Sequence, residues 1–161
     1  MDARPDEPGS AGPVRLVIVV PPRWRLPLLV LGFVSLAFGI AGGLARLTPM
    51  PVLPVAIALH GPLMVSAFFG TVISLERAVA LNRLWAYAAP LGAGLGGLLI
   101  LLGIVDWGFA LMAAGAVVFC IASVVILARQ PSLEMGTLLA GGLAWLTGNV
   151  LLFFGLPAVP W

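Results

Sequence analysis

Apolar residues fill most of this chain in five long runs, and short segments rich in proline, glycine or charged residues separate the runs. A helix needs about 20 mostly apolar residues to cross a hydrocarbon core about 30 Å thick. We therefore predict an all-α, polytopic transmembrane helix bundle with about five spanning helices. The predicted spans are residues 26–47, 52–78, 85–105, 107–128 and 135–155.

The beginning of the chain breaks this pattern. It mixes charged residues with prolines, and a segment of this composition buries too little apolar surface to order itself. We predict a disordered or interfacial tail over residues 1–22 and a transmembrane domain over residues 23–161. With the N-terminus in the cytoplasm, seven of the eight arginines lie on the inner side and only Arg46 lies outside. Because cytoplasmic loops carry an excess of basic residues, we predict a cytoplasmic N-terminus.

Composition supports the membrane assignment and excludes other classes. The chain is 61% apolar and 9% charged, with a mean hydropathy of +1.16, and a soluble domain of 161 residues cannot hide that much apolar surface. The lipid bilayer is therefore its main partner. The net charge of +2 comes with no basic face interleaved with aromatic residues, so we predict no nucleic-acid binding. All eight basic residues are arginine, which fits a GC-rich bacterial codon bias, and we predict a multi-pass protein of the bacterial cytoplasmic (inner) membrane.

Small residues recur at helical spacing within the predicted spans. Ser35, Gly39 and Gly43 repeat every four residues, and so do Gly92 and Gly96. Small residues at this spacing let two membrane helices approach closely, so we predict helix-packing grooves at both places. The glycine-rich run of the third span lacks the preceding strand that a nucleotide-binding loop requires, and we do not interpret it as one.

The segments between the later spans predict how the helices connect. A very short turn at Asp106–Trp107 joins the third and fourth spans, so these two helices are antiparallel neighbours. Ser132 precedes the last span and is of a residue type that caps helix N-termini. The chain ends in a proline-rich segment, residues 154–161, that resembles the passage from the first span into the second. We hypothesise that the chain is truncated before a sixth helix or is the first portion of a longer protein, so that its partners include helices of a homo-oligomer or of a missing C-terminal half.

Residues 59–83 hold the only histidine of the chain and most of its candidate chemistry. At about 100° per residue, His60, Met64, Thr71 and Ser74 fall within one narrow stripe of the second predicted helix. The other faces of this helix carry large apolar side chains that can meet lipid. An ionisable side chain inside a membrane span needs a polar partner and indicates a functional site.

Three interpretations of His60 remain open. It is an axial haem ligand or a copper ligand with Met64 one turn away, because imidazole suits iron and copper and thioether suits haem iron or copper(I). It is a protonatable element of a transport path that includes Thr71 and Ser74. Or it donates a hydrogen bond to a neighbouring span. Pro62 cannot donate to the carbonyl of the residue four positions earlier, so we also predict that the helix bends or loosens beside His60.

Other polar residues have simpler interpretations. Glu76 and Arg77 lie near the inner end of the second span, where we predict interfacial anchoring. Thr147 and Asn149 in the last span are predicted to be buried and to form hydrogen bonds across helices. No nucleophile–base pair and no pair of carboxylates occurs within one span, which favours a protein that is not an enzyme.

The segment HGPLMVSAFFGTVISLERAVAL, His60 to Leu81, resembles a recurring signature of uncharacterised bacterial polytopic membrane proteins and, more distantly, the NnrS family. NnrS-type proteins are haem- and copper-containing membrane proteins associated with nitric oxide stress. The resemblance implies that His60 is the candidate ligand position and that Gly70 to Arg77 are signature residues. NnrS-type proteins are longer and richer in histidine than this chain.

Two functions follow from these observations. The first is an NnrS-like membrane protein that contributes His60, with Met64, to a haem or metal site. The alternative is a small transporter-like or structural membrane subunit without a cofactor.

Overall fold

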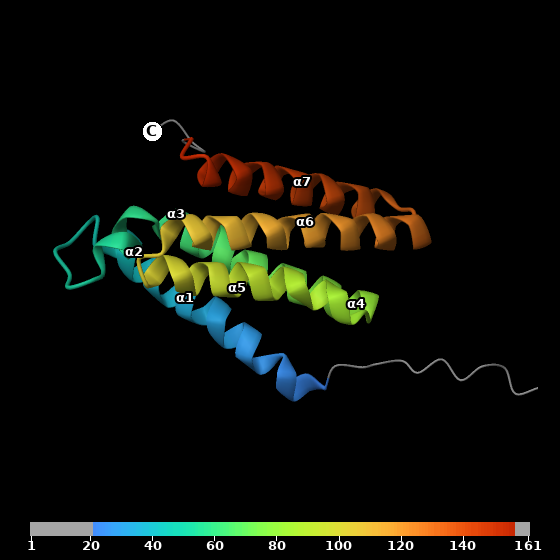
Figure 1. The fold of residues 1–161 in the computed structure, drawn as a ribbon, viewed down its shortest axis with the longest axis horizontal. Helices are drawn as coiled ribbons and strands as arrows, with labels where there is room; N and C mark the ends of the chain where they lie inside the picture. The colour runs from blue at the N-terminus through green and yellow to red at the C-terminus, as the bar shows by residue number, and fades with distance from the viewer. Residues whose placement is uncertain (1–20, 157–161) are drawn as a thin grey trace, which may run out of the picture.

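The computed structural model describes residues 21–156, and every regular element in this range is a helix. Five helical segments are long and apolar enough to cross a membrane (Figure 1). The predicted all-α fold with five such helices is confirmed. The five segments are Pro22–Leu44, His60–Leu81, Leu84–Leu101, Val105–Arg129 and Leu133–Phe153. The predicted tail falls outside the described residues except for its last two prolines, and so does the chain after residue 156.

The elements follow one another with short connections. In chain order they are the 3₁₀-helix η1 (Pro22–Trp24), α1 (Leu26–Leu44), α2 (Pro54–Ala58), α3 (His60–Pro62), the π-helix η2 (Leu63–Phe69), α4 (Gly70–Leu81), the 3₁₀-helix η3 (Leu84–Tyr87), α5 (Ala88–Leu101), α6 (Val105–Arg129) and α7 (Leu133–Phe153). Apart from the second span, the predicted boundaries differ from these by only a few residues, because hydropathy marks where an apolar run ends.

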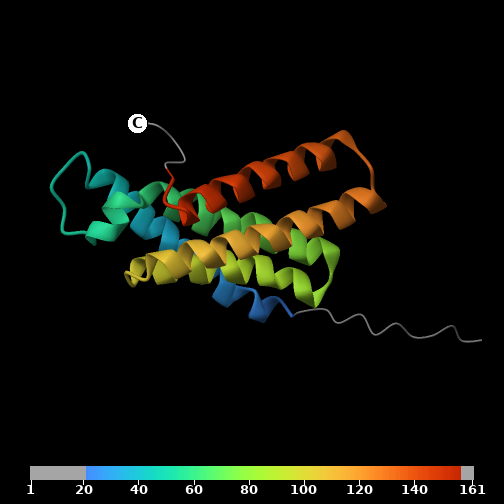
Figure 2. The same ribbon diagram turned by 45° about the horizontal axis from the view of Figure 1, so that its top comes forward.

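The bundle has α5 at its centre and α7 on its outside (Figure 1; Figure 2). α5 contacts α1, η2 and α4, and it also packs along α6. α7 packs chiefly against α6. In the most apolar stretch of α7 only 11% of the residues are buried, against 28–44% in the other four segments. α7 is therefore the helix that the rest of the bundle covers least.

The second span begins later than predicted: residues 54–58 form the separate short helix α2, and the membrane-length segment is His60–Leu81, in which α3, η2 and α4 follow one another directly. α2 ends at Ala58, and Leu59 leaves the helical conformation with φ −112° and ψ 25°. This is the place where a bend or loosening is expected from Pro62, which has no N–H for the carbonyl of Ala58. After Pro62 the chain winds as a π-helix for seven residues. Inserted π-helical turns are rare and occur frequently at functional sites.

Residues with positive φ follow three of the described helices, Gly155 after α7 (φ 68°) among them. Asn82 follows α4 with φ 52°, and Gly103 follows α5 with φ 83°. The turn between α5 and α6 thus lies at residues 102–104. The predicted turn at Asp106–Trp107 is wrong, because both residues belong to the first turn of α6. Glycine tolerates the left-handed conformation in which helices commonly end. Gly103 was therefore a better signal for the position of this turn than Asp106.

Glycines bring α5 and α6 into backbone contact. A Cβ atom added to Gly96 would lie 2.7 Å from the carbonyl oxygen of Gly108, and one added to Gly108 would lie 2.8 Å from the carbonyl oxygen of Gly96. Four residues earlier on α5, a Cβ atom on Gly92 would lie 3.2 Å from Cα of Gly115. The predicted packing groove at Gly92 and Gly96 is confirmed, and two glycines of α6 complete it.

The opposite side of α5 is equally tight. A Cβ atom on Gly97 would overlap the Ser35 hydroxyl of α1 and lie 2.6 Å from Cβ of Ala67 in η2. One on Gly94 would lie 3.3 Å from the Thr71 hydroxyl of α4. α5 therefore holds α1, the π-helix and α6 together by close backbone approach.

All described arginines except Arg46 belong to one end of the bundle, where α1 and α7 begin and where α4 and α6 end (Figure 1). We call this the arginine-rich end. Its members are Arg23, Arg25, Arg77, Arg83 and Arg129.

Candidate functional site

The predicted ligand pair His60 and Met64 lies against α1. A Cβ atom on Gly39 would lie 2.6 Å from Cγ of Met64, and one on Gly43 would lie 3.5 Å from Cδ2 of His60. The predicted groove of small residues on α1 therefore receives these two side chains. His60 is half-buried, and its Nδ1 lies 3.2 Å from the carbonyl oxygen of Ile57 in α2. The imidazole thus bridges the helix break to the preceding short helix.

The residues around this pair do not fit a haem. In residues 21–156 no three His, Cys, Asp or Glu side chains come together. Neither of the two cavities described below is lined by His60 or Met64. α1 contacts both side chains, so no porphyrin fits between them and α1. One imidazole and one thioether suit a soft ion such as copper(I) only with further ligands from outside the described residues.

Thr71 and Ser74 are buried inside the bundle, with exposed fractions of 0% and 1%. Each hydroxyl donates a hydrogen bond within its own helix: Thr71 to the carbonyl of Ala67 at 2.6 Å, and Ser74 to the carbonyl of Gly70. These bonds satisfy the hydroxyl protons without any other helix. The stripe predicted for the second span thus faces the core, and its two hydroxyls act in local backbone bonds.

The two polar residues predicted in the last span differ from each other. Thr147 is exposed, and its hydroxyl donates to the carbonyl of Leu143 at 2.9 Å in the same helix. Its predicted burial and cross-helix bond are wrong, because residue 147 lies on the face of α7 that no helix covers. Asn149 is 0% exposed, as predicted, but neither its Nδ2 nor its Oδ1 has a hydrogen-bond partner in the described structure.

Glu76 and Arg77 lie on α4 near the arginine-rich end. The Glu76 side chain is exposed and the Arg77 side chain is half-buried. Arg77 Nη1 donates to Sδ of Met135 in the first turns of α7 at 3.6 Å, while its Nε is buried without a hydrogen-bond partner in the described structure. Arg77 thus connects α4 to α7. The sequence did not predict this contact, because the two residues are far apart along the chain.

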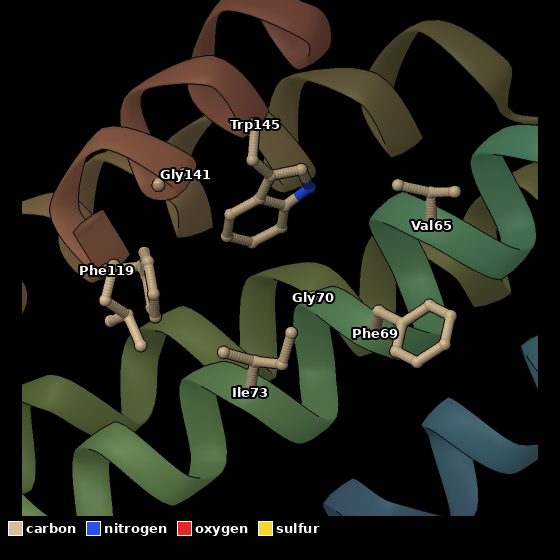
Figure 3. Close-up of a pocket in the computed structure, with 9 residues that line it drawn as sticks. Val65, Phe69, Gly70, Ile73, Phe119, Gly141 and Trp145 are labelled. Carbon is tan, nitrogen blue, oxygen red and sulfur yellow. The ribbon is translucent and has the colours of Figure 1, made fainter. Parts of the chain in front are cut away.

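The gap between α7 and the second span forms a cavity of about 300 Å³. We call it the lateral cavity, because Gly141, Phe69 and Ile73 on its rim are exposed at the side of the bundle. Figure 3 shows its lining side chains, which come from η2, α4, α6 and α7. They are Val65, Phe69, Gly70, Ile73, Phe119, Leu138, Gly141, Gly142 and Trp145. None of them carries a charge.

Trp145 crosses the cavity from α7 to the second span (Figure 3). A Cβ atom on Gly70 would overlap the six-membered ring of the indole, and the ring meets Phe119 edge-on at a centroid distance of 5.7 Å. Gly70 therefore makes room for the indole at the end of the π-helix. The Trp145 Nε1 is buried and has no hydrogen-bond partner within residues 21–156.

Comparison with known proteins gives a family but no function. The model of a family described as a domain of unknown function, DUF8744, matches residues 25–161. The chain belongs to the DUF8744 family. No curated protein and no solved structure gives a significant match.

In this DUF8744 member, sequence reasoning concentrated on His60 and missed the lateral cavity. One signal was present: Trp145 lies in the middle of a predicted span, whereas membrane tryptophans are enriched at the two interfaces. A second cavity of about 700 Å³ lies on the Arg46 side of the bundle, between α1 and residues 51–54, and its lining has no ionisable group.

Proposed function

We propose that this protein binds the hydrocarbon chain of a membrane lipid in the lateral cavity. The observation that carries the proposal is a concave space of about 300 Å³, without charged lining residues, that opens at the side of a membrane-type bundle. This proposal is a specific form of the second predicted function, a membrane subunit without a cofactor.

The cavity offers a lipid chain more than a flat helix surface does. Phe119 lies on α6 between the walls formed by α7 and by the second span, so a chain inside is contacted from several sides. Dispersion is the main attraction available between apolar groups in hydrocarbon, and it grows with the number of contacts. Glycines at positions 70, 141 and 142 widen the space, because they place no side chain in it.

A Gly141→Phe variant tests the proposal. Gly141 lines the cavity and a Cβ atom added to it meets nothing within 4 Å, so a side chain can begin there without a clash and take up part of the space. The measurement uses a protein in which Trp145 is the only tryptophan, the other four being phenylalanine, in vesicles of phosphatidylcholine with brominated chains. We expect Gly141→Phe to reduce the quenching of Trp145 fluorescence by about half or more, because a bound chain loses its place.

Leu143→Phe is the matched control, since Leu143 is 50% exposed and does not line the cavity. It should leave the quenching unchanged. Equal quenching in the parent, Gly141→Phe and Leu143→Phe proteins would show that only surrounding bilayer lipid reaches Trp145, and the proposal would fail.

The orientation and location follow the same membrane argument. We infer that the arginine-rich end faces the cytoplasm of a bacterial inner membrane, because arginines gather there and only Arg46 lies at the other end among described residues. Labelling a cysteine at Gln130 with a membrane-impermeant reagent, in intact and in broken cells, distinguishes the two orientations. The uncovered face of α7 supports the expectation that further helices, from a second copy or another chain, pack there, and this stays a prediction.

The His60 function is kept as a second candidate because of one observation. The contact of Nδ1 with the Ile57 carbonyl leaves Nε2 as the ring nitrogen available to a metal, the arrangement that metal-binding histidines commonly show. Together with the NnrS resemblance, it supports a copper site completed by ligands of another chain.

Metal analysis of the purified protein checks this candidate. The hypothesis expects stoichiometric copper that His60→Ala loses and that Met64→Leu weakens. A preparation from copper-supplemented cells that contains no copper would exclude it.

A further inference from the structure

A guanidinium lies one helical turn from the lateral cavity, on the side of the arginine-rich end. On α4, Arg77 lies one turn beyond the lining residue Ile73, and on α7, Met135 lies one turn before the lining residue Leu138. The hydrogen bond from Arg77 Nη1 to Met135 Sδ, 3.6 Å long, joins these two turns. The guanidinium therefore lies between the two walls of the cavity, at its end nearest the arginine-rich end.

The protein supplies little to balance this cation. A thioether sulfur is a weak acceptor, and the Arg77 Nε is buried without a hydrogen-bond partner in the described structure. The adjacent Glu76 side chain is exposed and points about 100° away around the helix. The Glu134 side chain, next to Met135, is exposed. A half-buried guanidinium with free donors favours an anion that accepts several hydrogen bonds, as a phosphate does.

We propose that Arg77 binds the phosphate of an anionic phospholipid whose acyl chain occupies the lateral cavity. This inference rests on the proposed function, because the cavity positions the lipid beneath the guanidinium. Charge complementarity selects the lipid, because a guanidinium without a carboxylate partner in the described structure favours an anionic headgroup, and basic pockets between membrane helices bind such headgroups. The headgroup lies where α4 ends and α7 begins, and the chain extends along the π-helix toward Trp145.

The test compares headgroups in the protein whose only tryptophan is Trp145. Vesicles contain equal amounts of phosphatidylglycerol and phosphatidylcholine, and either one or the other carries the brominated chains. From the quenching of Trp145 fluorescence, we expect phosphatidylglycerol to occupy the cavity about five times as often as phosphatidylcholine does. This is the effect of one arginine near the headgroups. Arg77→Gln should remove the preference, and Arg77→Lys, which keeps the charge without the planar fork, should retain part of it.

Arg83→Gln is the matched control, because Arg83 is exposed just beyond the end of the same helix. It should keep the preference. Equal loss in Arg77→Gln and Arg83→Gln would indicate general attraction to the surface and overturn the inference. Equal quenching by both lipids in the parent, still reduced by Gly141→Phe, would overturn the headgroup assignment alone. Quenching that Gly141→Phe does not change would instead reject the proposed function.

Discussion

Gly96→Leu will lower the free energy of unfolding by about 3 kcal/mol, because the added side chain meets backbone that cannot move aside. A Cβ atom at this position would already lie 2.7 Å from the Gly108 carbonyl oxygen and 2.7 Å from Cγ of Met112. α5 contacts α1, the π-helix and α6, so separating α5 from α6 disturbs the whole bundle. Titration of the purified protein with a denaturing detergent in mixed micelles measures the change.

The matched control for this experiment is Gly148→Leu. A Cβ atom on Gly148 meets nothing within 4 Å, so the same substitution there adds volume without a clash. Its unfolding free energy should stay close to that of the parent, or rise slightly, because leucine favours helix more than glycine does. If the two variants unfold at the same detergent fraction, the close contact of α5 with α6 is not what stabilises the bundle.

Asn149→Leu will raise the stability by about 1–3 kcal/mol, the usual cost of a buried polar group without a partner. The Asn149 side chain is fully buried, and both of its polar atoms lack hydrogen-bond partners in the described structure. Leucine has the same branching at Cγ and no polar atom, so it suits an apolar interior better. The detergent titration used for Gly96→Leu measures this change as well.

Thr147→Val serves as the comparison for Asn149→Leu. Thr147 is exposed on the same helix and bonds only the Leu143 carbonyl, so its replacement should change the stability little. A loss of stability in Asn149→Leu would contradict the prediction and show that the amide has a partner in the membrane, such as a ligand or another chain.

The sequence predicted the helical fold well because the physical signal is strong. Every stretch of about 20 apolar residues must form a helix in hydrocarbon, where an unpaired backbone group costs several kcal/mol. The packing groove at Gly92 and Gly96 was also predictable, since small residues four apart lie on one face. A bend or loosening of the helix beside His60 followed from Pro62 alone, because the missing N–H of proline is a property of one residue.

Other features of the second span needed the structure. Pro62 does not specify that a π-helix follows, and the position of His60 against Gly43 depends on how α1 crosses this segment. The stripe shared by Thr71 and Ser74 was predicted correctly as a face. Their bonds to carbonyls of their own helix show that this face is satisfied locally and lines the core.

The sequence by itself determined a membrane-type bundle of five long helices, a bend or loosening of the helix beside His60 and a concentration of arginine at one end. Only the tertiary structure decided that α7 packs chiefly on α6, that Trp145 spans the gap to Gly70, and that Arg77 meets Met135. Hydropathy and helical periodicity depend on neighbours along one helix, whereas a cavity depends on the distance between helices. That distance is set by side chains from several segments at once, and no single stretch of sequence contains it.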